Sequence, residues 1–431
     1  MADNIARVPP PGLTGRKPAL AMACLALSLL TGGAPAQTRG PTGVTLGENV
    51  QGLIATGREL SPALRAAALE SEAAAARASG AGALDDPVIS DSYQYYKGPG
   101  VFSAHTVMVT QAFPLWGKRD LRREAAQADA DATRGREQAA RDELDEKIKV
   151  AFAQHAVLTR SVALNREVQE IARRVRAATE ARYAQGGGDQ AGAIRSQGEE
   201  TSAKLELTRL EGERKAVRSR LNTLVGRRAD APLAEPQTAG RAVTVVPAIG
   251  ALVDRAHAGN PTLSSQGAAV AAARTRSTLA GKAWYPDITV GAGPLVQTNN
   301  RPVGFAATIG LNIPVPWGRA GSGQREAAAN VGASQQRYAA VLLEIEGSLG
   351  EARARWDAAR QTAALLRRES LPQARATLRA VLAAYGQGRG DLAAAIEAEH
   401  RIHDIELAAL RADLDERVSL AAIERLIGGD L

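Results

Sequence analysis

Residues 183–189 read Tyr-Ala-Gln-Gly-Gly-Gly-Asp, and residues 385–391 read Tyr-Gly-Gln-Gly-Arg-Gly-Asp, so the stretch Tyr-x-Gln-Gly-x-Gly-Asp occurs twice, 202 positions apart. Each copy interrupts a segment rich in alanine, arginine and glutamate, a composition typical of helices. Glycine adopts the left-handed conformation that ends a helix, and aspartate is a preferred N-cap for the next one. Each copy therefore predicts a tight turn between two antiparallel helices.

Other landmarks repeat at nearly the same distance, which argues against two unrelated glycine-rich turns. Ser61-Pro62 corresponds to Asn260-Pro261, 199 positions later. The segment at 113–117, Phe-Pro-Leu-Trp-Gly, corresponds to Ile-Pro-Val-Pro-Trp-Gly at 313–318, with one inserted residue. Leu-Val-Gly at 224–226 corresponds to Leu-Ile-Gly at 426–428. The chain therefore predicts one structural unit that is duplicated.

Each half contains a region with the alternation of β-strands. In the second half, one face of the last strand is expected to carry Phe305, Ala307, Ile309 and Leu311, and its other face is small and polar. Runs of about ten residues are long enough to cross a bilayer as tilted strands. A soluble hairpin packed on helices remains the alternative, but such a hairpin would expose charged residues on its second face. We therefore expect Phe305, Ala307, Ile309 and Leu311 to face lipid.

Aromatic residues gather in the same regions. Ten of the fifteen aromatic residues lie there, and several, including Trp116, Trp284 and Tyr285, fall at strand ends. This placement is typical of the aromatic girdle of a transmembrane barrel. The first strand alternates less cleanly, because Asp91 falls on its apolar face.

The pattern divides the chain into a leader, two repeats and a linker. The first repeat covers residues 37–226, the linker 227–246 and the second repeat 247–431. Within the first repeat we expect helices in 44–82, a β-hairpin at 87–113, a long helix at 118–183 and a return helix at 189–226. Within the second repeat we expect helices in 247–282, a hairpin at 286–313, a long helix at 319–385, which Pro372 should kink, and a return helix at 391–427.

Residues 1–36 resemble a secretory signal peptide. Arg16 and Lys17 precede an apolar run from 19 to 30, and Ala34-Pro35-Ala36 supplies a small-x-small cleavage site. The run is too short to span a bilayer as a helix, and no other stretch is apolar for about 18 residues. Cys24, the single cysteine, lies inside the run in a poor context for lipid attachment. We expect export and cleavage near Ala36.

Composition and motifs exclude several classes. Lysine and arginine (53) are interleaved with aspartate and glutamate (46), which is typical of solvated helix faces and not of nucleic-acid binding. No phosphate-binding loop, nucleophile motif or metal quartet is present, so we expect neither an enzyme nor a cofactor. His400 and His403 lie three apart on a helix but have no third ligand, so surface histidines are favoured over a metal site.

Four strands cannot close a sheet in lipid, where an open edge leaves backbone groups unpaired. About eight strands is the smallest closed barrel, so the chain is expected to oligomerise. The expected fold is mainly α with a β-barrel contribution. It consists of a duplicated unit of long antiparallel helices plus four transmembrane strands, and a trimer would form a 12-strand β-barrel and an α-helical barrel.

At this point the chain resembles the TolC family of outer-membrane efflux ducts over nearly all of its mature length. The duplication, the hairpin placement and the tip turns carry the resemblance, and residues 111–118, Gln-Ala-Phe-Pro-Leu-Trp-Gly-Lys, are most similar to the branch that serves heavy-metal efflux pumps. The resemblance implies a homotrimer in the outer membrane of a Gram-negative cell, in contact with outer-membrane lipid. It also implies a passive duct docked on a periplasmic adaptor and an inner-membrane pump of the resistance-nodulation-division type.

By the same resemblance, six residues at the helix tips would contact the adaptor and gate the aperture: Tyr183, Gly186, Asp189, Tyr385, Gly388 and Asp391. Heavy-metal cations are the expected substrate, with drugs or secreted proteins as alternatives. A periplasmic adaptor or a structural coiled-coil protein remains the alternative outside this class, although neither needs four strands of this length.

Overall fold

The computed structural model describes residues 46–97, 102–186, 190–237, 245–297, 303–315, 319–387, 389 and 392–431. Every element of the first repeat has a counterpart in the second. The first contains α1 (Val50–Leu60), α2 (Pro62–Gly80), β1 (Val88–Tyr96), β2 (Phe102–Phe113), α3 (Lys118–Ala184) and α4 (Gln190–Leu224). The second contains α5 (Ile249–Gly259), α6 (Pro261–Gly281), the 3₁₀ turn η1 (Lys282–Trp284), β3 (Asp287–Gln297), β4 (Gly304–Asn312), α7 (Arg319–Leu365), the π-helical turn η2 (Leu366–Ser370), α8 (Leu371–Gly386) and α9 (Leu392–Ile427).

The short helices of each repeat are separated by a junction that is followed directly by a proline. Pro62 and Pro261 occupy the first helical turn of α2 and α6, where the missing N–H costs nothing. Asn260 caps α6, because its Oδ1 accepts a hydrogen bond from the backbone N–H of Leu263 at 2.9 Å. Gly57 lies inside α1, where a Cβ would come within 2.7 Å of the Ile148 side chain. This glycine therefore permits close packing of α1 on α3.

The second long helix, expected over 319–385 with a kink at Pro372, is divided by an irregular turn next to that proline. The π-helical turn η2 separates α7 from α8 directly before Pro372. Proline has no N–H to donate to the preceding turn, and a π turn is one way for a helix to accommodate that loss. The corresponding helix α3 runs through 67 residues without such a turn.

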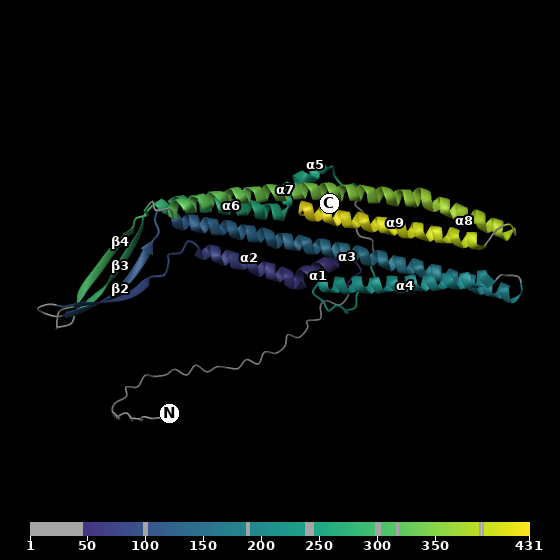
Figure 1. Cartoon of the computed structure of the whole chain (residues 1–431), viewed down its shortest axis with the longest axis horizontal. Helices are drawn as coiled ribbons and strands as arrows, with labels where there is room; N and C mark the ends of the chain where they lie inside the picture. Colours follow the sequence, from purple (N-terminus) through teal and green to yellow (C-terminus); the bar gives the residue numbers. More distant parts are fainter. Residues whose placement is uncertain are drawn as a thin grey trace, which may run out of the picture. The chain divides into compact units, whose positions relative to one another are not determined.

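The long helices lie side by side in two layers, and the two layers are built in a similar way (Figure 1). Helix α3 contacts α2, α4, α6 and α9, while α7 contacts α6 and α9. Each repeat has its own hydrophobic core, built from corresponding helices. The fully buried residues Leu53, Ile148 and Leu221 of the first core match Leu252, Leu349 and Ile423 of the second. The duplication read from the sequence is thus also a duplication of packing.

The four strands form a single antiparallel sheet in the order β1-β2-β3-β4 (Figure 1). The central pairing joins the two repeats, since β2 pairs with β3 from Ala104↔Gln297 to Phe113↔Ile288. A Cβ at Gly293 would lie only 1.8 Å from the carbonyl oxygen of Val107, so this strand approaches its neighbour too closely for any side chain. Among the described residues, β1 and β4 each pair on one side only.

Candidate functional site

One face of the sheet is apolar and exposed, and we call it the apolar face. Residues directly opposite in neighbouring strands share a face, so Ile309, Val290 and Leu311 lie together with Ile288. The Ile309 side chain is 80% exposed and that of Phe305 is 74% exposed. Further members are Ile89, Tyr93, Tyr95, Val107, Val109, Phe113, Val296 and Ala307. All four residues expected to face lipid are therefore on this face and exposed.

The opposite face, which we call the polar face, is small, polar and more buried. Thr106 is only 8% exposed and Ala104 only 3%, and Gly291 and Gly293 lie on the same face. Among the described residues of this face the only charged side chain is Asp287. A soluble sheet buries its apolar face and exposes its polar face. Here the apolar face is exposed and the polar face is more buried, which is the arrangement of a transmembrane barrel.

The apolar face also carries an acidic and a basic side chain next to each other on neighbouring strands. The Oδ2 of Asp91 lies 3.7 Å from Nδ1 of His105, and the ring of Tyr93 lies 4.8 Å from that imidazole. Asp91 thus falls on the apolar face, as the sequence indicates, and His105 with Tyr93 lies beside it. The two side chains are therefore near neighbours in a surface that is largely apolar.

The sheet is joined to the helices by an ion pair at the start of α3. The Nζ of Lys118 donates to both carboxylate oxygens of Asp287, at 2.9 and 2.8 Å, and to the backbone oxygen of Tyr285 at 2.8 Å. Asp287 also accepts from the backbone N–H of Leu115 at 3.0 Å. Lys118 is 7% exposed, and sequence reasoning noticed it only as the end of the 111–118 segment. This ion pair fastens β3 of the second repeat to α3 of the first.

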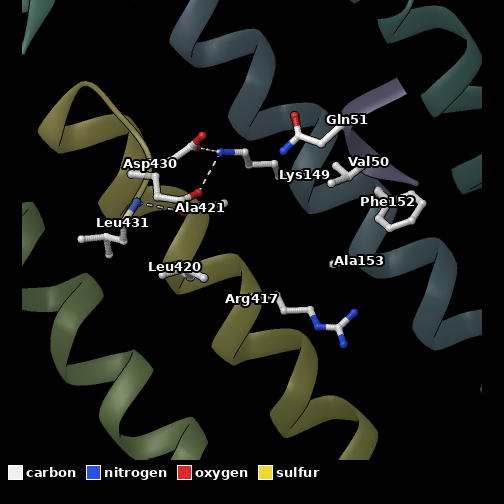
Figure 2. A pocket seen from close by; sticks show the side chains of 11 residues that line it. Val50, Gln51, Lys149, Phe152, Ala153, Arg417, Leu420, Ala421, Asp430 and Leu431 are labelled. Carbon is white, nitrogen blue, oxygen red and sulfur yellow. Dashed lines mark hydrogen bonds and ion pairs between the residues drawn. The ribbon is translucent and has the colours of Figure 1, made fainter. Parts of the chain in front are cut away.

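A second charged cluster joins the C-terminal end of α9 to α3 (Figure 2). The Nζ of Lys149 donates to Glu424 at 2.8 Å and to Asp430 at 2.7 Å. Burial lowers the pKa of Lys149, but the hydrogen bonds with Asp430 and Glu424 outweigh it, so the net pKa is raised and the ammonium stays charged. Beside it lies a cavity of about 170 Å³, lined by apolar groups such as Phe152 and Leu420 and by Arg417. The cluster holds the second repeat against the first.

At the far ends of the long helices the two tips of one chain are connected. The guanidinium Nη1 of Arg182 donates to the hydroxyl of Tyr385 at 3.2 Å. Tyr183 is exposed, and Gly186 has the left-handed φ of 74° that its turn requires. The other expected tip residues, Asp189, Gly388 and Asp391, lie outside the described residues. Arg182 was missed by sequence reasoning, because nothing in the pattern pairs residues 203 positions apart.

The two histidines of α9 serve a contact between helices. The Nε2 of His400 lies 3.7 Å from a carboxylate oxygen of Glu199 in α4. Burial lowers the pKa of His403, and the charge of His400 lowers it further, against the opposing effect of Asp404 and Glu406. Within the described ranges no group of three histidine, cysteine or carboxylate side chains could hold a metal ion. His400 and His403 are half-buried.

The comparisons with known proteins match this geometry. The model of the outer membrane efflux protein family matches residues 53–227 and 252–429, one match in each repeat. These segments make up most of the chain, so the protein belongs to the outer membrane efflux protein family. The expected membership of the TolC family is thereby confirmed, and the family is one of channels and not of enzymes. No curated protein sequence matches the chain.

Solved structures share the fold at low sequence identity. The outer membrane protein VceC from Vibrio cholerae matches with a TM-score of 0.76 and 19% identity, over 88% of this chain and 96% of that one. The open state of the MtrE outer membrane channel from Neisseria gonorrhoeae has a TM-score of 0.75 and 20% identity, over 89% of each chain. CusC has a TM-score of 0.77 and 18% identity, over 88% of this chain and 92% of that one. Along the described parts of this chain, no helix combines the length and the apolar character needed to cross a membrane.

Proposed function

We propose that the protein is the outer-membrane duct of a tripartite efflux system. The observation that carries the proposal is the reversed polarity of a four-stranded sheet whose two outer strands, within the part of the chain that the structure describes, each lack a partner on one side. Backbone groups at such edges cannot remain unpaired in lipid. Three chains would supply twelve strands and close a barrel with the apolar face outward, so the duct is a homotrimer. Export follows from the signal peptide expected at 1–36.

The polar face would line the barrel. Its described residues carry mainly hydroxyl, amide and small side chains, together with the apolar Val88, Met108 and Leu295, while the carboxylate of Asp287 is held by Lys118. Such a lining attracts neither cations nor anions strongly. The duct is therefore permissive, and selection of the substrate belongs to the inner-membrane pump. The family assignment favours this duct over a periplasmic adaptor or a structural coiled-coil protein.

The exported substrate is proposed to be a heavy-metal cation, on the similarity of residues 111–118 to the heavy-metal branch. Deleting the gene in the natural host should raise sensitivity to heavy-metal salts several-fold, and the intact gene should restore growth. The sensitivity of the same strains to lipophilic drugs is measured for comparison. Sensitivity to drugs without sensitivity to metals would support the alternative of a drug duct, and failure to export a large protein would support a duct for type I secretion.

The helix tips are proposed to contact a periplasmic adaptor and to gate the aperture. Tyr183, Gly186, Asp189, Tyr385, Gly388 and Asp391 form this tip, and a trimer would gather six carboxylates from the two aspartates of each chain. The aspartates would cap their helices and attract cations to the opening. The hydrogen bond from Arg182 to Tyr385 supports a gate, since it ties the tip of α3 to the tip of α8.

Replacing Tyr385 by phenylalanine should shift the gate towards its open state. The change removes only the hydroxyl that accepts from Arg182, a bond worth about 1 kcal/mol, so the open fraction should rise by up to about five-fold. The conductance of the purified channel in a planar bilayer measures this open fraction. Tyr183→Phe is the matched control at the equivalent position of the first repeat, where the described residues offer the hydroxyl no hydrogen bond. If the two variants have equal conductance, the Tyr385 hydroxyl has no role in gating.

A further inference from the structure

An exposed tryptophan between the sheet and α3 has a backbone conformation that bulky residues rarely adopt. Trp116 has a φ of 64° and is 52% exposed. A left-handed conformation at a non-glycine residue costs free energy and is retained where the surrounding structure or function requires it. The indole Nε1 donates to the backbone oxygen of Pro286 at 2.8 Å, which fixes the ring and leaves much of it exposed. The ring is thus held in place without being buried.

Trp116 belongs to a stack that ends in a cation. Its ring lies 5.3 Å from the ring of Tyr285, with 44° between the planes. The ammonium of Lys282 lies 4.9 Å from the centre of the Tyr285 ring, a cation–π contact. Tyr285 is itself exposed, as is the neighbouring Trp284. An exposed indole, a phenol and an ammonium therefore lie in sequence at the end of the apolar face.

Two cations at this junction have no ion-pair partner among the described residues. Among the described residues no carboxylate pairs with Lys282, whose one recorded contact is the Tyr285 ring. The carboxylate of Asp287 is already held by Lys118 at 2.8 Å. Arg122 lies one turn beyond Lys118 in α3 and is half-buried. Neither Lys282 nor Arg122 has an ion-pair partner among the described residues, so both cations can accept an anionic ligand.

We propose that this junction binds the headgroup of an anionic phospholipid of the phosphatidylglycerol type. The headgroup phosphate would lie between Lys282 and Arg122, the rings of Trp116 and Tyr285 would lie at the headgroup level, and the acyl chains would run along the apolar face. Amphipathic rings favour that level of a bilayer, and cations there favour anionic lipid. The site rests on the proposed placement of the sheet in a membrane.

The test measures quenching of tryptophan fluorescence by lipids with brominated acyl chains. The intact trimer is reconstituted in vesicles of phosphatidylethanolamine and phosphatidylglycerol, with bromine on one lipid and then on the other. The parent protein should be quenched more strongly by brominated phosphatidylglycerol. In Lys282→Gln/Arg122→Gln this preference should fall by about five-fold for each cation removed, since each is worth about 1 kcal/mol near an anionic surface.

The matched control is Arg174→Gln/Lys215→Gln, which removes two exposed cations from the helices and should leave the preference unchanged. Equal quenching by both lipids in the parent, or an unchanged preference in Lys282→Gln/Arg122→Gln, would refute the lipid site while leaving the channel intact. Absence of quenching by either lipid would refute the membrane placement and the lipid site together. Added inorganic phosphate should not reduce the preference beyond the effect of equal ionic strength, because the site requires the acyl chains as well as the phosphate.

Discussion

Replacing Ile309 by arginine should abolish the trimer, whereas replacing the adjacent Thr308 by arginine should leave it assembled. Ile309 lies on the apolar face and is 80% exposed, so the charged group would have to enter lipid. A cationic side chain near the middle of a bilayer costs about 2–4 kcal/mol on a lipid-facing barrel position, and three copies occur in a trimer. Thr308 lies on the polar face opposite Gly291, where an arginine can reach water.

Unheated gel electrophoresis of the outer-membrane fraction measures both variants. Ile309→Leu is the control for size and should run as a trimer. Circular dichroism of the purified chains checks that the helices still form, so that loss of the trimer can be assigned to the sheet. If Thr308→Arg fails and Ile309→Arg assembles, the two faces have been assigned the wrong way round.

Replacing Lys118 by methionine should destabilise the protein by about 3 kcal/mol. Removing one partner of a buried ion pair costs about 3–5 kcal/mol, and the lower value applies because the Asp287 side chain is 29% exposed. The loss would leave the Asp287 carboxylate without its cation at the point where β3 meets α3. We expect the trimer to dissociate at a lower temperature, which heating of samples before electrophoresis measures.

Two further variants separate the ion pair from general effects. The double variant Lys118→Met/Asp287→Leu should recover most of the stability, because an apolar pair of similar size often replaces a buried ion pair without loss. Lys147→Met removes an exposed ion pair with Glu143 and should cost less than about 1 kcal/mol. A Lys118→Met protein as stable as the parent would show that Asp287 is adequately solvated without the lysine.

The fold class could be predicted because its signals are periodic and occur twice. Alternation in β4 places Ile309 and Leu311 on one face, and the duplicated turn at Gly186 places the helix tips. The site depends on contacts that periodicity does not describe. The bond from Arg182 to Tyr385 and the stack of Trp116 on Tyr285 join residues far apart in sequence, so that only the packing of the two repeats brings them together.

Two features of the helices depend on packing rather than on local sequence. Gly57 lies inside α1, where its lack of a side chain permits the close approach of Ile148. Pro372 indicates an irregular helix, yet its type, a π turn over Leu366–Ser370, depends on how the freed backbone groups are accommodated. Local sequence shows where a helix can depart from regular geometry. Contacts with the rest of the fold determine which structure forms there.

The π turn η2 occurs in the second repeat and not at the corresponding position of α3. A ring of three such chains would contain six long rods, but it would have threefold and not sixfold symmetry. Since η2 interrupts the regular hydrogen-bond ladder, the α7–α8 rods bend more easily at that point than the α3 rods do. The stiffer α3 helices would then alternate around the ring with the more flexible α7–α8 helices. An opening motion would occur mainly by bending of the three α7–α8 helices.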